Sequence, residues 1–426
     1  MFEGRIDALT PKGTGLLFDK ERPVYISDGL PNEHVNYDIT HHAKTYSRAR
    51  VTKIITPNPD RVLPICPLSG RCGGCQLQHY HYPAQLAWKQ ALLAKALSGF
   101  NIPLLPPISG PPFHWRNKLQ LDVTGAIIGL SERDSAAYVD IPHCFLVSET
   151  TNSVLTHLRA MLKKDPLQGL SRIVIREHGG QHMLVFYAPT IVKKTLLEMQ
   201  AIPQVASIYV MPPGSPPTAH CLYGQTYLWQ SIGDLAFPIG PDGFFQGNAA
   251  CLNTFVSAVA DACHLSPKET LWDLHAGSGL LGLSLAKKAK NVVLSETYPN
   301  SRAMGEMVIS KFMISNAYYR AISAEESILQ LPDTGHHTVL LDPPRKGCTP
   351  ELMAQICAKK QNRVVYVSCN LPPFVAAAKQ LCAAGYLLSH VQLVDMFPHT
   401  IHAETIAVFV KERPDLLCSG NVSFYP

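Results

Sequence analysis

Two residues near the end of the chain could carry out covalent catalysis. Cys369 follows the apolar run VVYVS, and Glu404 lies in DMFPHTIHAETIAVF, at the start of another apolar run. A thiolate is a soft nucleophile and a carboxylate can accept a proton, so the pair could attack one ring carbon and deprotonate its neighbour. Those steps would alkylate a carbon of a pyrimidine. Taken alone, Cys369 could also be a buried cysteine that only packs.

A second set of residues could bind a cofactor that contains adenosine. WDLHAGSG places Gly277 and Gly279 in a turn between a strand and a helix, where glycine lets a ligand approach the backbone closely. Glu296 ends the next apolar run, and a carboxylate there can bind both hydroxyls of a ribose. The glycine pattern is not the full dinucleotide motif, which favours S-adenosylmethionine; a tight turn without a ligand is the alternative. Asp342 ends a third apolar run, before two prolines that stiffen the loop.

Four cysteines could hold a metal centre. Cys66, Cys72 and Cys75 have the spacing C-x5-C-x2-C, and Cys144 stands alone in VDIPHC. Four thiolates suit either a tetrahedral zinc ion or a [4Fe–4S] cluster, and the paired glycines before Cys75 leave room for inorganic sulfide. The spacing does not choose between the two, and thiols that bind nothing are a third alternative. The other cysteines are expected to pack in the core: Cys221, Cys251, Cys263, Cys348, Cys357, Cys382 and Cys418.

The elements that must position these residues change in type along the chain. Residues 1 to 56 alternate short β-rich runs with Gly, Pro and Asn turns, which predicts a small OB-like barrel. Residues 57 to 235 predict a β-rich central part, with Gly179-Gly180 as a hairpin turn and a helix near 83–97 that could pack on the catalytic domain. From residue 236, apolar runs alternate with amphipathic segments such as ELMAQICAKK. This pattern predicts a doubly wound α/β sheet with its chemistry at the carboxyl ends of the strands.

The composition is that of a globular protein. Of the 426 residues, 46% are hydrophobic and 16% are charged, which is too apolar for a disordered chain. No apolar run approaches the ~18 residues of a membrane span, and the N-terminus lacks the apolar core of a secretory signal. The expected compartment is therefore the cytoplasm. The net charge of +5 permits a polyanionic partner without requiring one.

Five motifs together carry a family resemblance. DPPRKG, VVYVSCN, DMFPHTIHAET, FFQGN and CGGCQLQHY resemble motifs of the RNA uracil-5-methyltransferase family, in its iron–sulfur branch, and the matches extend in family order over essentially the whole chain. The resemblance implies a Rossmann-like class I methyltransferase domain over residues 236–426 and a β-rich central domain over residues 57–235. It also implies a small RNA-binding TRAM barrel over residues 1–56.

The resemblance implies roles for single residues. Cys369 adds to C6 of uracil, C5 takes the methyl group of S-adenosylmethionine, and Glu404 removes the C5 proton. The residues implied in cofactor binding are Gln246, His275, Glu296 and Asp342. The residues that match the ligands of a [4Fe–4S] cluster are Cys66, Cys72, Cys75 and Cys144. Because methyl transfer needs no redox step, the cluster is expected to shape the RNA-binding surface rather than to act in catalysis.

The chain departs from the family pattern at two places. Many members have an aromatic residue and a cysteine where this chain has His275-Ala276, and a β-branched residue where FFQGN has Gly247. Neither departure affects the nucleophile or the base. Arg116 and Lys118, in WRNKLQLDV, also match a family stretch and could contact RNA or only solvent.

The implied partner is RNA. The target uridine should be unpaired or flipped out of its helix, because C5 and C6 must be reached from both faces of the ring. The exposed basic residues expected on the barrel could contact phosphate or only solvent: Lys44, Arg48, Arg50 and Lys53. The first choice of substrate is 23S ribosomal RNA. The alternatives are the same chemistry on transfer RNA, and a non-catalytic RNA-binding or folding factor on the same scaffold. DNA and membranes are not expected partners, and no protein partner is inferred.

Overall fold

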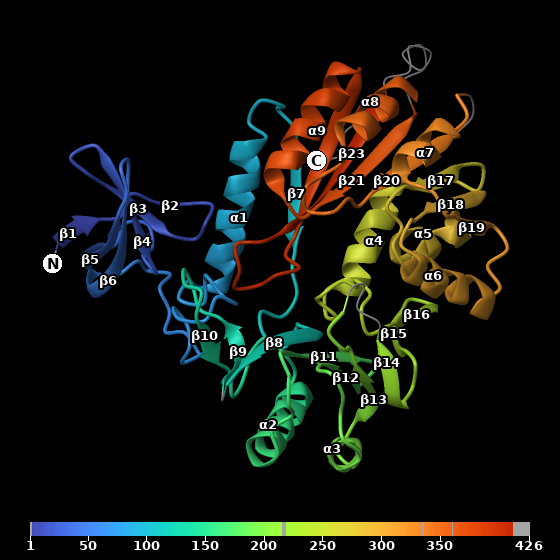
Figure 1. Cartoon of the computed structure of the whole chain (residues 1–426). Helices are drawn as coiled ribbons and strands as arrows, with labels where there is room; N and C mark the ends of the chain where they lie inside the picture. The colour runs from blue at the N-terminus through green and yellow to red at the C-terminus, as the bar shows by residue number, and fades with distance from the viewer. Residues whose placement is uncertain (1, 126, 215–218, 334–335, 360, 412–426) are drawn as a thin grey trace.

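The computed structural model describes residues 2–411, apart from residues 126, 215–218, 334–335 and 360. Within this part of the chain the strands form sheets of six, seven, two and eight strands. Figure 1 shows the six-stranded sheet as a separate lobe at the N-terminal side, the seven-stranded sheet below, and the eight-stranded sheet with its helices above.

The N-terminal lobe is a sheet around a small apolar core. Its strands, in the order β1-β5-β6-β4-β3-β2, are β1 (Phe2–Arg5), β2 (Ala8–Leu9), β3 (Gly15–Asp19), β4 (Arg22–Ser27), β5 (His34–His42) and β6 (Ser47–Thr56). Buried and exposed residues alternate at the start of β6, where Ala49 is buried and Arg48 and Arg50 are exposed. Because successive side chains of a strand point to opposite faces, the arginines lie on the outer face of the lobe.

The central sheet has helices on it that the sequence pattern did not predict. Its strands, in the order β10-β9-β8-β11-β12-β13-β14, are β8 (Lys118–Thr124), β9 (Ile127–Ser131), β10 (Tyr138–Asp140), β11 (Arg172–His178), β12 (Gln181–Tyr187), β13 (Val205–Val210) and β14 (His220–Gly224). Gly179 and Gly180 join β11 and β12 with positive φ angles, as the hairpin prediction requires. The helices are α2 (Glu149–Lys164) and α3 (Lys193–Gln200). Ser148 caps α2 by accepting a bond from the Thr151 N–H, a start signal that was readable in the sequence.

A short hairpin, β15 (Leu228–Ile232) and β16 (Leu235–Ile239), leads into the catalytic part. There the sheet has the order β19-β18-β17-β20-β21-β23-β22-β7. Its strands are β7 (Leu104–Ile108), β17 (Thr270–Asp273), β18 (Asn291–Ser295), β19 (Ala317–Arg320), β20 (His337–Leu341), β21 (Arg363–Ser368), β22 (Tyr386–Val394) and β23 (Glu404–Lys411). The helical segments are α1 (Tyr82–Ala96), α4 (Leu252–Cys263), α5 (Leu280–Ser284), η1 (Ala286–Lys288), α6 (Pro299–Lys311), α7 (Ala324–Leu329), α8 (Pro350–Lys359) and α9 (Leu371–Ala383).

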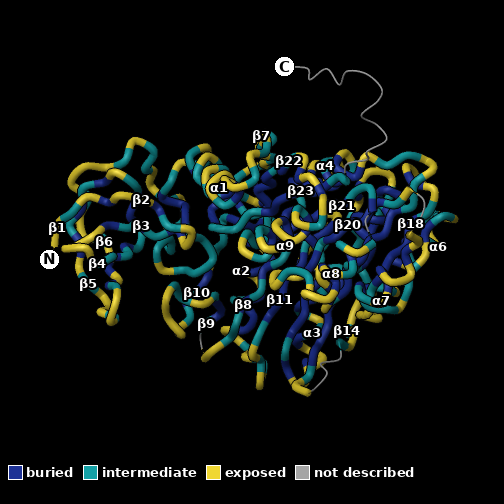
Figure 2. The backbone as a smooth tube through the Cα atoms, turned by 90° about the horizontal axis from the view of Figure 1, so that it is seen from above, coloured by how far each residue is buried: buried dark blue, intermediate teal, exposed yellow. Residues whose placement is uncertain are grey.

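Both faces of the eight-stranded sheet are covered. Neighbouring residues of β20 belong to different cores: Val339 and Leu341 pack with α8 and α9, and Leu340 packs with α4 and α5. Figure 2 shows buried backbone through the strands of this sheet and exposed residues on the loops around it. Strands β17 to β21 pair in parallel, and β23 runs antiparallel to β21. The predicted doubly wound α/β class is confirmed.

Elements that precede residue 236 complete this sheet. Strand β7 pairs in parallel with β22, and Leu93 and Leu97 pack in the core beneath α9. A domain that begins at residue 236 therefore does not contain the whole eight-stranded sheet. Strand β7 of this sheet comes before the central sheet in the sequence.

The remaining cysteines differ in burial. Cys251 and Cys263 are buried, and Cys348, Cys357 and Cys382 pack at the margin of the core, as predicted. Cys221 is exposed, contrary to the prediction, because it lies on β14 at the edge of the central sheet. Cys418 lies outside the described residues. None of the helices in the described ranges is both long enough and apolar enough to cross a membrane.

Candidate active site

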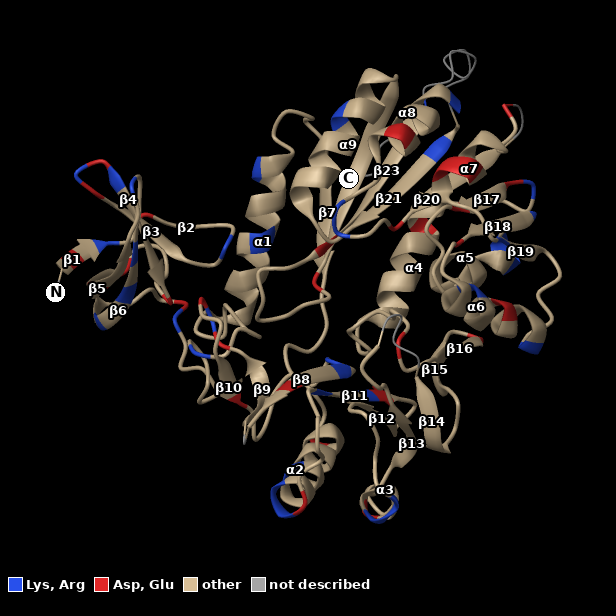
Figure 3. Ribbon diagram, in the orientation of Figure 1, with Lys and Arg blue, Asp and Glu red and all other residues tan. Residues whose placement is uncertain are grey.

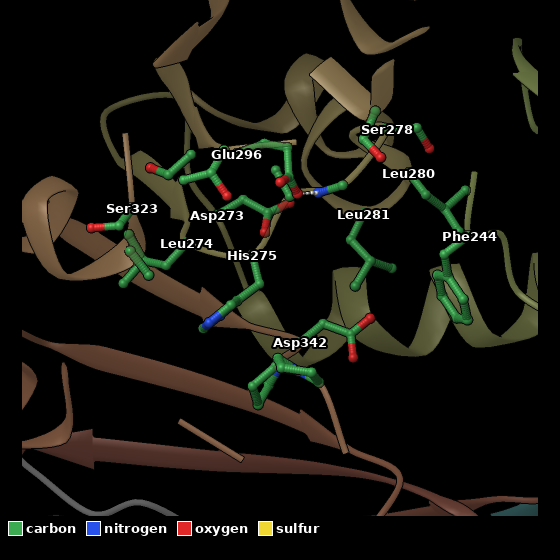
Figure 4. Close-up of a pocket in the computed structure, with 18 of the residues that line it drawn as sticks. Phe244, Asp273, Leu274, His275, Ser278, Leu280, Leu281, Glu296, Ser323 and Asp342 are labelled. Carbon is green, nitrogen blue, oxygen red and sulfur yellow. Dashed lines mark hydrogen bonds between the residues drawn. The ribbon is translucent and has the colours of Figure 1, made fainter. Parts of the chain in front are cut away.

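One cavity of about 660 Å³ gathers the residues predicted for catalysis and cofactor binding: Gln246, His275, Glu296, Asp342, Cys369 and Glu404. Strand ends bring them together. Glu296, Asp342 and Cys369 directly follow β18, β20 and β21, and Glu404 begins the antiparallel β23. The carboxyl ends of parallel strands and the amino end of an antiparallel one meet at the same sheet edge. Figure 4 shows His275 and Asp342 around this cavity, with Ser323 and Phe244 on opposite sides.

Cys369 and Glu404 lie next to each other across the β21–β23 ladder. The last pair of the ladder joins Ser368 to Thr405, so Cys369, which directly follows β21, and Glu404, the first residue of β23, lie just beyond that pair. The Thr405 hydroxyl donates to the Ser368 carbonyl over 3.2 Å, which holds the two strand ends together. Backbone pairing therefore positions the thiol and the carboxyl side by side.

Burial and mutual repulsion favour the neutral forms of the acidic groups. Burial raises the pKa of Cys369, the Glu404 and Asp342 carboxylates raise it further, and Arg345 lowers it. Burial, and then Asp342, raise the pKa of Glu404. Burial also raises the pKa of Asp342. A cationic group in the cavity would favour ionisation of all three.

The glycine turn faces the cavity and holds Glu296. The Gly277 N–H donates to Glu296 Oε2 over 3.0 Å, and the Tyr298 N–H donates to Oε1 over 2.6 Å. Gly279 has a φ of +79°, and a Cβ there would lie 2.5 Å from the Tyr319 hydroxyl, so only glycine fits. Tyr319 in turn donates to the Gly277 carbonyl over 3.2 Å.

Gln246 is held from the central sheet. The Asn117 side chain donates to the Gln246 carbonyl over 2.8 Å, and the Asn117 N–H donates to the Gly247 carbonyl over 3.1 Å. The Gln246 side-chain nitrogen lies 3.5 Å from Asp342 Oδ2, at the limit of a hydrogen bond. The residue before β8 thus fixes one wall of the cavity.

Sequence reasoning missed several residues that line the cavity, among them Asp273 and Phe244. Asp273 ends β17 four residues before Gly277, and an acidic residue at that distance from a glycine turn was a usable signal. Burial, and then Asp342, raise its pKa to about 7. Phe244 is 78% exposed, in FFQGN.

Besides Glu404 Oε2, two buried polar atoms of the cavity, Asp273 Oδ1 and His275 Nδ1, have no hydrogen-bond partner among the described residues. Burial lowers the pKa of His275 to about 4, so its ring is neutral at pH 7. Because an unsatisfied buried polar group is costly, both atoms fit a site completed by a polar ligand.

A second cavity, of about 30 Å³, is lined by the four predicted metal ligands Cys66, Cys72, Cys75 and Cys144. N–H groups point at two of the sulfurs: the Gly74 N–H donates to Cys72 Sγ over 3.4 Å, and the Gln78 side chain donates to Cys75 Sγ over 3.3 Å.

Burial, and then the neighbouring thiols, raise the pKa of Cys75 to about 12. In the part of the chain that the structure describes, no group of three or more His, Cys, Asp or Glu side chains is arranged to hold a metal ion.

Comparisons with known proteins agree with this geometry. Residues 233–413 match the family described as tRNA (Uracil-5-)-methyltransferase. The chain is 30% identical to an RNA methyltransferase of Bacillus cereus, over 94% of each chain. It belongs to the RNA uracil-5-methyltransferase family. The protein is therefore an S-adenosylmethionine-dependent enzyme that methylates uracil in RNA.

Two further relatives of the methyltransferase cover nearly the whole chain. A 23S rRNA (uracil(1939)-C(5))-methyltransferase of Pectobacterium atrosepticum is 28% identical over 96% of this chain and 93% of its own. The crystal structure of the Pyrococcus abyssi tRNA (uracil-54, C5)-methyltransferase in complex with S-adenosyl-L-homocysteine has a TM-score of 0.79 and 24% identity. That match covers 96% of this chain and 100% of the other, and it shows that the two share a fold.

The methyltransferase has basic residues near the active site and on the N-terminal lobe (Figure 3). Arg116 forms a backbone bridge with Asn248, beside the loop that carries Gln246. Burial, and then Arg176 and Arg116, lower the pKa of Lys118 to about 8. The basic residues predicted on the lobe are exposed: Lys44, Arg48, Arg50 and Lys53.

Proposed function

We propose that the enzyme forms 5-methyluridine in 23S ribosomal RNA, with Cys369 as the nucleophile and Glu404 as the base. The observation that carries the proposal is the position of a thiol and a carboxyl at adjacent strand ends, inside the cavity that also contains the Gly277 turn and Glu296. A nucleophile and a base so close can act on neighbouring atoms of one ring.

In the proposed cycle the Cys369 thiolate forms a bond to C6 of uracil, and the electrons of the C5–C6 double bond move to C5. C5 then bonds to the methyl group, whose bond to the cofactor sulfur breaks. Glu404 removes the C5 proton, the C5–C6 double bond reforms, and the bond between C6 and sulfur breaks to release the thiolate. Uracil C5 is a poor nucleophile without the added sulfur, so covalent addition must come first.

The residues around the glycine turn would bind the cofactor. S-adenosylmethionine supplies an electrophilic methyl group when bound. We assign Glu296 to the ribose hydroxyls, since its carboxylate already lies at the turn. The unpartnered polar atoms of Asp273 and His275, with Gln246 and Asp342, would bind the polar groups of the methionine part or the adenine.

We further propose that Cys66, Cys72, Cys75 and Cys144 hold a [4Fe–4S] cluster. The donor set supports it: four thiols line one cavity, and N–H groups point at two sulfurs, as they do around thiolate ligands. The cluster would tie the segment after residue 66 to Cys144, between β10 and α2.

Transfer RNA is the second candidate substrate. The matching family description and the Pyrococcus enzyme are named for transfer RNA. The Pectobacterium enzyme, which has the higher identity of the two relatives, is named for 23S ribosomal RNA. The basic N-terminal lobe is compatible with either substrate.

The deciding experiment maps 5-methyluridine in ribosomal and transfer RNA from cells that lack the gene. Loss of one ribosomal 5-methyluridine, restored by the wild-type gene and not by Cys369→Ala, is the expected result. Loss from transfer RNA alone would contradict the ribosomal assignment. Restoration by Cys369→Ala would support a non-catalytic RNA-binding role instead.

A separate experiment tests the cluster. Anaerobic purification should give a brown protein that contains iron and sulfide, whereas a colourless, zinc-loaded protein would contradict the cluster proposal.

A further inference from the structure

Two buried polar side chains of α1 hold the loop that leads to the proposed base. Gln85 and Lys89 are four residues apart and face the same side of the helix. Their exposed fractions are 0% and 3%. Their partners lie mainly in residues 395–403, which connect β22 to β23 and which we name the base loop. Lysine and glutamine are seldom this buried without a specific set of partners.

Lys89 bonds the base loop at both ends. Its Nζ donates to Asp395 Oδ1 over 2.7 Å, to the Phe397 carbonyl over 3.2 Å and to the His402 carbonyl over 2.8 Å. All three ammonium protons are therefore used. Asp395 is completely buried, and its other oxygen accepts a bond from the Tyr82 hydroxyl of the same helix over 3.0 Å.

Gln85 bonds the middle of the base loop. The His399 N–H donates to Gln85 Oε1 over 3.1 Å, and Gln85 Nε2 lies 3.1 Å from His399 Nδ1. The His399 carbonyl accepts bonds from the N–H groups of Gln76 and Leu77, over 2.9 and 3.0 Å. His399 has a φ of +64°, a left-handed conformation that is uncommon for residues other than glycine.

Glu404 directly follows the base loop and is the first residue of β23. Its Oε2 is buried and has no hydrogen-bond partner among the described residues. The place of that oxygen therefore follows from the backbone of Glu404, which is positioned by its pairing with Val394 on β22 and by the base loop that leads into it. His402, whose carbonyl bonds to Lys89, is only two residues away, and its Nδ1 lies 3.4 Å from the Arg345 guanidinium beside the nucleophile.

We propose that Lys89 and Gln85 are positioning residues for proton abstraction: by fixing the base loop they set where the Glu404 carboxylate stands beside Cys369. This inference rests on the proposed function. If it holds, loosening the loop slows the step that uses Glu404 more than the steps that precede it. The covalent link between Cys369 and methylated RNA would then accumulate, because its breakdown requires loss of the C5 proton.

A purely structural role must be separated from positioning. Removing one member of a buried ion pair leaves the other charge unpaired and destabilises the fold, whereas replacing both members is often tolerated. The main variant is therefore the double change Lys89→Met with Asp395→Asn, which leaves no unpaired charge. Gln85→Met, which removes no charge at all, is the second variant. Lys95→Met is the matched control, because Lys95 lies on the same helix and is exposed.

The measurements are the melting temperature, kcat and KM for RNA and for S-adenosylmethionine, and the fraction of enzyme linked to labelled RNA on a denaturing gel. We expect the double variant to melt within about 5 °C of wild type. We expect its kcat to fall about 100-fold, as for a displaced catalytic group. Both KM values should fall by a similar factor, so that kcat/KM stays within about 3-fold of wild type, because kcat/KM reports only the steps up to methyl transfer. The linked fraction should rise, with Gln85→Met showing the same pattern more weakly.

Wild-type kcat in the double variant or in Gln85→Met would overturn the inference. So would a low kcat without linked RNA. If the double variant does not fold, Gln85→Met alone decides between these outcomes. Glu404→Gln, measured in parallel, tests the proposed function itself: if that variant accumulates no linked RNA, then the assignment of the base is wrong, whatever the helix variants do.

Discussion

The active-site cavity and the cysteine cavity both gather acidic groups, but they differ in what surrounds them. The larger cavity, of about 660 Å³, combines one thiol with several carboxyls and contains polar atoms without partners. The smaller one, of about 30 Å³, contains four thiols, and N–H groups already donate to two of the sulfurs. The first arrangement leaves its groups able to gain and lose protons, whereas the second matches the thiolate ligand set of the cluster proposed above.

In the proposed roles, cysteine serves two purposes in this protein: Cys369 is a nucleophile and Cys75 is a metal ligand. Cys369 shares its cavity with Arg345, which favours its thiolate, and with a carboxyl that can exchange a proton. Cys75 has other thiols as neighbours, which oppose ionisation unless a metal neutralises the charge. A reactive cysteine and a ligating cysteine are thus distinguished by their neighbours, not by their own burial. Four experiments test this distinction.

Replacing the nucleophile should have the largest effect. Cys369→Ala removes the only atom proposed to bond to C6, so we expect 5-methyluridine formation to fall by about 10⁴-fold or more. The rate is measured by transfer of a labelled methyl group to RNA. Cys221→Ala is the control, since Cys221 is exposed and lies on the central sheet. Wild-type turnover in Cys369→Ala would show that Cys369 is not the nucleophile. The proposed difference in chemistry between the two cavities would then be wrong.

Replacing the base should slow a later step. Glu404→Gln keeps the shape of the side chain but cannot accept the C5 proton, and loss of a general base costs about 10²- to 10⁴-fold in kcat. Addition to C6 and methyl transfer remain possible, so RNA should stay linked to Cys369. A denaturing gel with labelled RNA measures the linked fraction. A slow variant that leaves all RNA free would mean that Glu404 acts before covalent addition.

Replacing one thiol of the cysteine cavity should reduce stability more than chemistry. Cys72→Ala would remove one cluster ligand, and loss of a bound metal centre is among the changes that cost roughly 3–5 kcal/mol of unfolding free energy. We expect the brown colour, the iron content and the melting temperature to fall together. Unchanged stability and colour would show that the four thiols do not hold a cluster.

The smallest expected effect is a dependence of ligand preference on pH. Burial raises the pKa of Asp273 to about 7 and that of Glu404 above its usual value, so the cavity gains negative charge as pH rises from 6 to 8. The cationic sulfonium of S-adenosylmethionine should stabilise these anions, and S-adenosylhomocysteine, which has no sulfonium charge, is the matched control. By linkage, the affinity ratio of the two should grow about 3- to 10-fold over this range. Isothermal titration calorimetry at each pH measures the two affinities. A ratio that does not change with pH would mean that the sulfonium binds away from these carboxyls.

Sequence patterns predicted the fold best where apolar runs were long. The alternation of strands and helices after residue 236 led to the doubly wound sheet, because each buried strand is apolar on both faces. The same reasoning could not place β7 in that sheet. Its sequence, LLPPI, contains two prolines, and its residues are only partly buried or exposed. It pairs with residues of β22 that lie almost 300 positions later in the sequence, so no local pattern predicts the pairing.

The residue types at the strand ends could be read from the sequence alone: a thiol at position 369, carboxyls at 296, 342 and 404, and a glycine turn at 277. Parallel pairing then requires these ends to share an edge, so the site could be predicted from periodicity and motifs. Only the tertiary structure decided that Lys89 and Gln85, on a helix before the central sheet, hold the loop preceding Glu404, and that Asn117 holds Gln246. Such contacts join elements far apart in the chain through single hydrogen bonds, and no local pattern encodes them because they arise only when separately folded layers pack together.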